Sequence, residues 1–288
     1  MTVNLDVSIV IPTLGEKKLI KVVHYLNKNT TFRISEIILS IPRNKYNYVK
    51  SITKNIDNIK LVCNGKKGQV LQRINGFKAA KENNVLQLDD DTFISCEDIN
   101  LLRKKIFGIN QKKSVAPIFK TFSSEYLHKR KNNFLHNIHF YILTLIFGST
   151  KKINNFGTFD NSLISFKGNG TYRNLSDSTR VDWTLGACLL HKKKNLILKN
   201  YYPFLGKSFF EDVLHSLEMK SKGINLYLIK NASAYCKREE SIKDFNDLVN
   251  YLRAVKFFTY KTQMGFFDKF RKIYAFFIYR LVRLIIKN

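Results

Sequence analysis

Three consecutive carboxylates, Asp89, Asp90 and Asp91, follow the short apolar segment 85–88. Three neighbouring negative charges repel one another and resist removal from water, so a bound cation would stabilise them. Carboxylate oxygens suit hard divalent ions such as Mg2+ and Mn2+, and these ions in turn bind phosphate oxygens. The segment predicts a site for a metal-bound phosphate compound at the carboxyl end of a strand, where open α/β sheets bind ligands. A solvated acidic turn, or a helix cap before Thr92, is the alternative interpretation.

A second acidic pair, Glu211 and Asp212, begins a segment with helical spacing. A carboxylate within hydrogen-bonding reach can take the proton from an attacking hydroxyl, so the pair is a candidate general base. Acidic residues are also favoured at helix N-termini by about 0.3–1 kcal/mol each, so a purely capping role is the alternative. Aromatic-rich segments at 201–204 and 209–210 favour a site, because they could shield the pair and form a wall for sugar stacking.

The elements that must position these acids alternate between strand and helix in the first 90 residues. Apolar runs predict buried strands at residues 7–11, 36–41, 59–63 and 85–88, and helical spacing predicts helices at residues 17–27 and 69–82. This alternation predicts a mostly parallel sheet with helices on both faces. Further along, we expect strands at 182–190 and 224–229, and a helix over 211–222 that Gly223 ends as a C-cap.

Four segments, taken in order, resemble the family 2 glycosyltransferases of the GT-A fold. They are the opening strand 7–13, the basic, glycine-bearing helix 68–76, a D-x-D motif at 89–91 and an E-D motif at 210–214. The resemblance implies an α/β fold of the GT-A (Rossmann-like) type, with a mostly parallel central sheet, flanking helices and C-terminal amphipathic helices. It places a glycosyltransferase domain at residues 1–240 and a basic, helical, membrane-associating extension at 241–288.

The resemblance implies an inverting enzyme that moves a sugar from a nucleoside-diphosphate sugar to a glycan or lipid-linked acceptor, as in surface polysaccharide assembly. Mg2+ or Mn2+ would stabilise the departing diphosphate electrostatically. Asp91 would be the direct metal ligand, with Asp89 as a second. Asp212 would be the general base, with Glu211 orienting the substrate or the base.

The remaining candidate residues are assigned to the two substrates. The resemblance gives nucleotide-sugar contacts to Pro12, Thr13, Arg73, Asp89 and Asp90. Lys66 and Lys67 would support Arg73, although a solvated basic loop explains these lysines equally well, and Pro12 and Thr13 could simply end a strand. Trp183 and Gly186 would lie on the acceptor side, where a small residue permits close approach; a lone Trp is more often a core residue.

Two positions depart from the family pattern. Many members have an acidic residue at the end of the second strand that binds the nucleotide base, whereas this chain has Ser40-Ile41-Pro42-Arg43. Many also have a histidine that completes the metal site after the last strand, where this chain has Cys236. A thiolate is a poor Mg2+ ligand, so Cys236 is either a small buried residue or an unusual metal neighbour.

The net charge of +27, from 49 Lys and Arg against 22 Asp and Glu, predicts anionic partners. In the segment 266–288, most cations fall on one stripe of a helix whose other face is apolar, which is typical of helices at an anionic membrane surface. A helix packed on the domain is the alternative. The N-terminal residues do not resemble a signal peptide and the four cysteines form no C-x-x-C pair, so we expect a cytoplasmic protein on the inner face of the cell membrane.

Two other functions use some of the same features. A sugar-phosphate nucleotidyltransferase would also use Asp-held Mg2+, but such enzymes usually begin with a glycine-rich basic loop, and only Gly15 follows the first strand here. A basic nucleic-acid-binding protein fits the charge, but the sequence has no helix-turn-helix, zinc or RNP signature. Three adjacent aspartates would also repel phosphate without a metal, so we expect no nucleic-acid partner.

Overall fold

The computed structural model describes residues 2–107, 112–122, 175–204, 208–236 and 245–262, together with two short strands, β9 (Thr158–Phe159) and β10 (Ser165–Phe166). These residues belong to two compact units. The first unit contains the described residues up to 122 and from 175 to 236. The second contains β9 and β10, which pair antiparallel, and the helix α7 (Phe245–Lys261). The predicted membrane-facing segment 266–288 lies outside the described residues.

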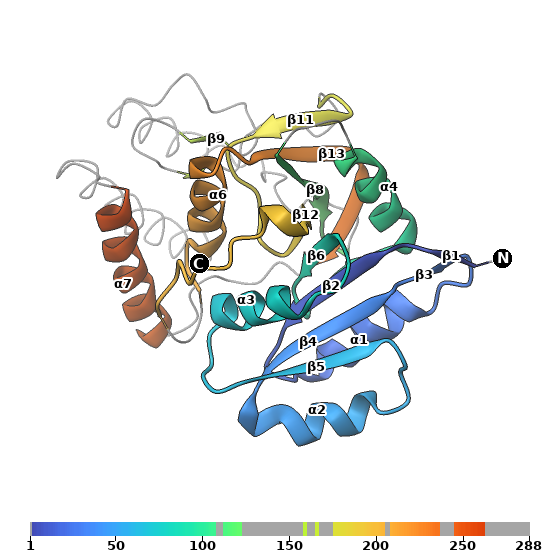
Figure 1. The fold of residues 1–288 in the computed structure, drawn as a ribbon. Helices are drawn as coiled ribbons and strands as arrows, with labels where there is room; N and C mark the ends of the chain where they lie inside the picture. Colours follow the sequence, from blue (N-terminus) through green and yellow to red (C-terminus); the bar gives the residue numbers. More distant parts are fainter. Residues whose placement is uncertain are drawn as a thin grey trace, which may run out of the picture. The chain divides into compact units, whose positions relative to one another are not determined.

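A mixed sheet forms the centre of the first unit (Figure 1). Its nine described strands are β2 (Val7–Pro12), β4 (Glu36–Pro42), β5 (Ile59–Asn64), β6 (Asn84–Leu88), β7 (Thr92–Ile94), β8 (Lys113–Lys120), β11 (Ser178–Val181), β12 (Cys188–Lys192) and β13 (Asn225–Cys236). The order is β11-β13-β8-β12-β6-β2-β4-β5, and β7 pairs with β13. Strands β5, β4, β2, β6, β8 and β13 run in one direction; β12, which lies between β6 and β8, and the strands β11 and β7, which pair with β13, run in the other. The expected mostly parallel sheet is confirmed.

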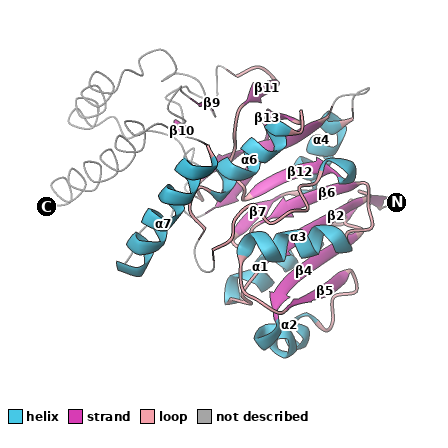
Figure 2. Cartoon of the chain, turned by 60° about the vertical axis from the view of Figure 1, so that its left-hand side comes forward, coloured by secondary structure: helices cyan, strands magenta, loops and turns pink. Residues whose placement is uncertain are grey.

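Helices cover both faces of this sheet. Their bounds are α1 (Lys17–Asn27), α2 (Tyr46–Thr53), α3 (Gln69–Ala79), α4 (Cys96–Ile106) and α6 (Glu211–Ser221). Helix α1 buries Leu19, Val22, Val23 and Leu26, which share one face at helical spacing, in the same cluster as residues of α2 and α4. Helix α3 packs on the opposite face, where Phe77 joins the cluster that contains Val10. Figure 2 shows α3 in front of the sheet and α1 behind it.

Local hydrogen bonds explain where two predicted boundaries are wrong. Helix α3 ends at Ala79, before the predicted residue 82, and Ala80 is extended. The backbone N–H groups of Lys81 and Glu82 instead donate to Glu36 Oε1 and Ser8 Oγ, at 2.6 and 2.9 Å. These bonds direct the chain into β6.

The predicted strand at 182–190 is also wrong at its beginning. Strand β12 starts at Cys188, and residues 182–187 form a loop because their bonds go elsewhere. The carbonyl of Gly186 accepts from the side chain of Gln87, and the carbonyl of Ala187 accepts from Asp89 N at 2.9 Å. Strand β13 continues beyond the predicted residue 229 to Cys236, with a register irregularity between Ile229 and Ser233.

Close packing of α3 on β2 depends on Gly76. A Cβ atom at Gly76 would overlap Cγ1 of the fully buried Val10. We expect Gly76→Ala to destabilise the protein by about 1–2 kcal/mol, since overpacking costs about 1–3 kcal/mol and the better helix propensity of alanine returns about 1. Urea unfolding measures this change. Gly65→Ala is the control, because nothing lies within 4 Å of its added Cβ, and a stabilised Gly76→Ala variant would contradict the packing argument.

Candidate functional site

The acidic turn after β6 lies where the buried strand ends. All five residues of β6 are buried, and Asp89, Asp90 and Asp91 follow at the carboxyl end. Thr92 N donates to Asp89 O at 3.1 Å, which closes a tight turn before β7. The apolar run therefore ends abruptly in three carboxylates at the same edge of the sheet as Thr13, which follows β2.

The three carboxylates of this turn point to different partners. Asp89 Oδ1 accepts from Arg73 Nη2 at 3.3 Å and from Gln69 Nε2 at 3.2 Å. Asp90 Oδ2 accepts a short hydrogen bond of 2.5 Å from Thr13 Oγ1, and Asp91 Oδ2 lies 3.9 Å from Lys18 Nζ. Among the described residues, no group of three or more His, Cys, Asp or Glu side chains converges on a common point where a metal would be enclosed.

A buried arginine joins this turn to the second acidic pair. The side chain of Arg73 is 1% exposed, and its Nη1 donates to Glu211 Oε2 at 2.7 Å. The hydroxyl of Tyr201 also donates to Glu211 Oε2, at 3.3 Å. We call Arg73, Asp89, Glu211 and Tyr201 the arginine network. It brings the N-terminus of α6 to the end of β6, although Arg73 and Glu211 are 138 residues apart in sequence.

Burial and charge act against each other in this network. Burial opposes the charge of Arg73, but the carboxylates of Glu211 and Asp89 and the neighbouring Tyr201 raise its pKa above the ordinary value, so it stays protonated. Burial raises the pKa of Asp89 to about 7, against the pull of Arg73, and the nearby Glu211 carboxylate adds to the rise. Burial also raises the pKa of Asp90, and the bond from Thr13 opposes that rise. An added cation at the turn would therefore stabilise the ionised aspartates.

The start of α6 is tightly constrained around Glu211. Phe210, the residue before the helix, has a left-handed backbone with φ of 61°, which costs a non-glycine residue free energy and is common at functional sites. A Cβ at Gly186 would lie 2.8 Å from Glu211 Oε1 and 3.1 Å from Gln87 Nε2, so the glycine leaves the space that Glu211 occupies. Asp212 is half-buried, and its Oδ1 accepts from Val213 N at 2.9 Å.

Two buried histidines lie behind the arginine network. The ring of His215 stacks on Tyr201 with 5.1 Å between centroids and 4° between planes, and His191 lies 5.5 Å from His215. His191 Nδ1 shares a 2.9 Å hydrogen bond with Ser114 Oγ. Burial lowers the pKa of His191 to about 3 and lowers that of His215 well below its usual range, so both rings are neutral supports.

A set of buried amides supports the turn after β2. Gln72 Nε2 donates to the carbonyls of Thr13 and Ser40, at 2.9 and 2.7 Å, and Asn64 Nδ2 donates to Ser40 Oγ at 2.9 Å. Sequence reasoning missed Asn64, and it placed Gln69 and Gln72 in the helix motif 68–76 without a role of their own, because a lone amide carries no spacing signal. Lys66 and Lys67, in contrast, are exposed in the loop before α3.

Other predicted residues lie at the edge of this arrangement. Trp183 is 4% exposed and packs in the interior, whereas Gly186 in the same loop contacts Glu211. Cys236 is 8% exposed and pairs with Thr92 across β13 and β7, directly beside the acidic turn.

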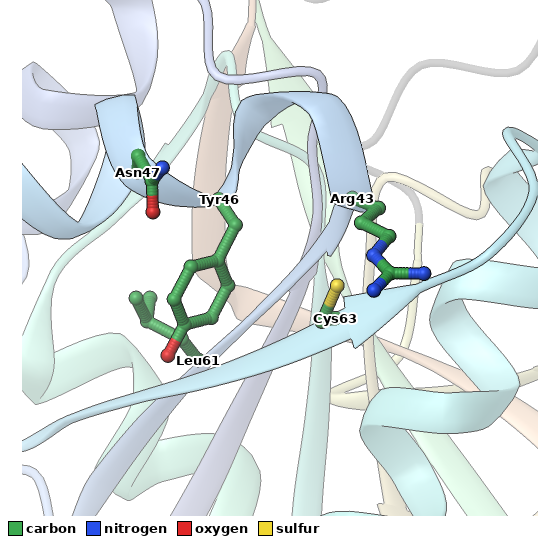
Figure 3. Close-up of a pocket in the computed structure, with 5 residues that line it drawn as sticks. All are labelled: Arg43, Tyr46, Asn47, Leu61 and Cys63. Carbon is green, nitrogen blue, oxygen red and sulfur yellow. The ribbon is translucent and has the colours of Figure 1, made fainter.

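A shallow pocket of about 540 Å3 lies at the outer strand of the sheet. It is lined by Arg43, Tyr46, Asn47, Leu61 and Cys63, from the end of β4, the start of α2 and β5 (Figure 3). None of the predicted site residues lines it. Its walls include Arg43, which directly follows β4 and belongs to the segment 40–43, where the family pattern would have an acidic residue.

Neither the models of known protein families nor the curated proteins include a match to this sequence. Solved structures do match. GalNAc-T7 with UDP, GalNAc and Mn2+ has a TM-score of 0.57 and 16% identity over 87% of this chain. S. aureus TarS 1–349 in complex with UDP-GlcNAc has a TM-score of 0.52 and 15% identity over 89% of this chain. The chain spans 48% of the first structure and 65% of the second.

These likenesses concern the fold. The chain has a glycosyltransferase-like fold, and the expected α/β architecture of the GT-A type is confirmed. Within the part of the chain that the structure describes, none of the helices has the length and apolar character needed to cross a membrane.

The arginine network should dominate local stability. We expect Arg73→Met to cost about 3–5 kcal/mol, because it leaves Glu211 buried without its partner. The double variant Arg73→Met/Glu211→Gln should lose less free energy of unfolding, measured with urea, than the two single variants lose in sum. Lys220→Met is the control, since its 3.2 Å pair with Asp182 is exposed and should contribute less than about 1 kcal/mol. Equal losses for Arg73→Met and Lys220→Met would contradict this role.

The neutral histidines should make the fold sensitive to mild acid. Since the pKa of folded His191 is about 3 and an unfolded histidine titrates near 6.5, the unfolded state binds the extra proton between these values. Stability therefore falls as the pH falls from 6.5, by up to about 1.4 kcal/mol per pH unit from this group. We expect a shallower fall between pH 6.5 and 4.5 for His191→Gln, measured by urea unfolding at each pH. If the free energy of unfolding falls equally with pH in the wild type and in His191→Gln, His191 is not buried in its neutral form.

Proposed function

We propose that the chain is a metal-dependent inverting glycosyltransferase of the family 2 type, which moves a sugar from a nucleoside-diphosphate sugar to a glycan or lipid-linked acceptor. The observation that carries the proposal is the arginine network, which unites the acidic turn after β6 with the acidic start of α6 at the carboxyl ends of parallel strands. The glycosyltransferase-like fold supports it, and the two similar structures contain UDP or UDP-GlcNAc.

The donor set of the acidic turn fits a divalent cation that is shared with the substrate. Mg2+ is usually bound through one or two carboxylates and substrate phosphates, and not by an all-protein cage. We therefore assign Asp91 as the ligand, with Asp89 as the second carboxylate. The Mn2+ in the GalNAc-T7 structure supports a metal with this fold. The ion would supply electrostatic stabilisation of the diphosphate leaving group.

The nucleotide-sugar would contact the chain through the turn after β2 and the acidic turn. Pro12, Thr13, Asp89 and Asp90 are the proposed contacts, and the Thr13–Asp90 hydrogen bond ties the two turns together. The family resemblance predicts that Arg73 contacts the pyrophosphate directly. Its 1% exposure and its two carboxylate partners favour a different role, in which it positions Asp89 and Glu211.

The transfer step needs a base for the acceptor hydroxyl. We assign Asp212, which is half-buried at the first turn of α6, and the adjacent Glu211 would orient it or the acceptor. Direct displacement by the activated hydroxyl inverts the anomeric carbon. Gly186 would keep the acceptor side open beside Glu211, while Trp183 supports that loop from the interior.

The domain division and the location follow from the sequence. We propose a catalytic domain at 1–240 and a membrane-associating extension at 241–288, with the protein on the cytoplasmic face of the cell membrane. The excess of cations supports an anionic surface as partner.

A panel of nucleoside-diphosphate sugars tests this function. We expect at least one to raise the melting temperature in Mn2+ or Mg2+, and Asp91→Ala to lose the metal-dependent part of that rise. Asp212→Asn should keep the rise but lower transfer or sugar-nucleotide hydrolysis by about 10²–10⁴-fold.

Asp57→Asn is the matched control, because Asp57 is exposed and precedes the amino end of β5, whereas the candidate site lies at the carboxyl ends of the parallel strands. The base assignment fails if Asp212→Asn turns over at the normal rate. The function itself fails if no nucleoside-diphosphate sugar in the panel stabilises the protein with either metal.

A further inference from the structure

The end of the central sheet farthest from the acidic turn carries a cluster of cations. Strand β6 begins at Asn84 and β8 begins at Lys113, whereas the reversed strand β12 ends at Lys192, so these residues meet at one edge. Asp89 follows the opposite end of β6. We define the basic face as Lys81, Arg103, Lys112, Lys113, Lys192, Lys193, Lys194 and Lys222.

Hydrogen bonds show that this face is continuous over several elements. Lys192 Nζ donates to Asn84 Oδ1 at 3.1 Å, and Lys193 Nζ donates to the carbonyl of Lys81 at 3.4 Å. Lys112 Nζ donates to the carbonyl of Lys222 at 3.3 Å. Asn195 Nδ2, beside Lys194, donates to the carbonyl of Lys113 at 3.2 Å and links these two groups, so lysines from four separate parts of the chain share one surface.

The cations of the basic face are close enough to repel one another. Burial lowers the pKa of Lys192, and the charges of Lys194 and Lys113 lower it further. Between described residues, no ion pair involves a cation of this face. The acids at this end include the exposed Asp6 and Asp57, the half-buried Glu82 and the buried Glu36, which accepts hydrogen bonds from Ser8 Oγ and Lys81 N. A strong positive field remains on the surface.

An exposed aromatic side chain lies among these cations. Phe107 follows α4 and is 59% exposed, and Lys192 Nζ lies 3.7 Å from the centre of its ring. Cations around a protruding apolar group suit the headgroup region of an anionic bilayer, where the ring enters the interface and the amines meet phosphates. Single-stranded nucleic acid would stack bases on ring faces, and Lys192 leaves only the other face of Phe107 for such stacking.

We propose that the basic face is a docking surface for anionic lipid headgroups of a membrane. This surface belongs to the first unit and is formed by residues other than the segment 266–288. It does not depend on the proposed function. Docking by this face directs the carboxyl ends of the parallel strands, and the candidate site, away from the lipid. The chain would then act on groups that extend from the membrane into water.

Vesicle sedimentation with the full chain tests the surface. The test variant is Lys112→Glu/Lys193→Glu/Lys194→Glu, and the control is Lys45→Glu/Lys50→Glu/Lys54→Glu, which changes the net charge equally at exposed positions around α2. Each cation near an anionic surface contributes about fivefold to partitioning. We expect the test variant to bind phosphatidylglycerol-containing vesicles about 100-fold more weakly, and the control less than tenfold.

Further arms distinguish lipid docking from nucleic-acid binding and from loss of folding. Wild-type protein should not bind pure phosphatidylcholine vesicles, and Phe107→Ser should weaken binding to the anionic vesicles. Unchanged melting temperatures would show that all variants are folded. The proposal is overturned if test and control variants lose vesicle binding equally, or if the test variant binds like wild type. It is also overturned if the test variant loses only RNA or DNA binding at the same salt concentration.

Discussion

A guanidinium group that is almost wholly removed from water is stable only beside carboxylates, and Arg73 imposes this constraint on the first unit. Its side chain is 1% exposed, and its Nη atoms face Glu211 and Asp89. Neither acid can move away without leaving a buried charge. The ion pairs therefore fix the start of α6 against the end of β6, and any chemistry at this edge depends on their geometry.

The reversed strand β12 makes this geometry possible. It lies between β6 and β8, and its pairing with β6 begins at Cys188, opposite Leu88. The loop before it brings Gly186 against Glu211, where a side chain would collide with the carboxylate. The bond from Asp89 N to Ala187 O attaches that loop to the acidic turn. The proposed donor side and the proposed acceptor side of the candidate site thus share one hydrogen-bonded frame.

Features that depend on local sequence could be predicted. The strands at 7–11, 36–41 and 85–88 are apolar runs, and the helix from Glu211 ends at Ser221, shortly before Gly223, whose φ of 70° favours glycine. The acids at 89–91 and 211–212 stand out by their order and by a family resemblance. Apart from the order of the motifs, each of these signals is carried by a few neighbouring residues.

Features that depend on distant partners could not be predicted. The basic and polar sequence neighbours of Arg73 favour a substrate contact, while the partner that buries it is 138 residues away. The apolar segment after Asp182 favours a strand, although tertiary hydrogen bonds hold its first half as a loop. The stacking of Tyr201 on His215 likewise exists only after α6 has docked.

The distance along the chain between the two acids of the arginine network has a consequence for biosynthesis. About 120 residues separate Asp89 from Glu211, which a ribosome adds in roughly 6–25 s at 5–20 residues per second. For most of that interval the nascent chain presents Arg73 and an unfinished sheet edge, because β12 emerges only after residue 192 has been added and α6 emerges later still. Strand β6 therefore lacks its second neighbour, β12, during this time. We expect chaperones to bind the nascent chain mainly before residue 211 leaves the exit tunnel.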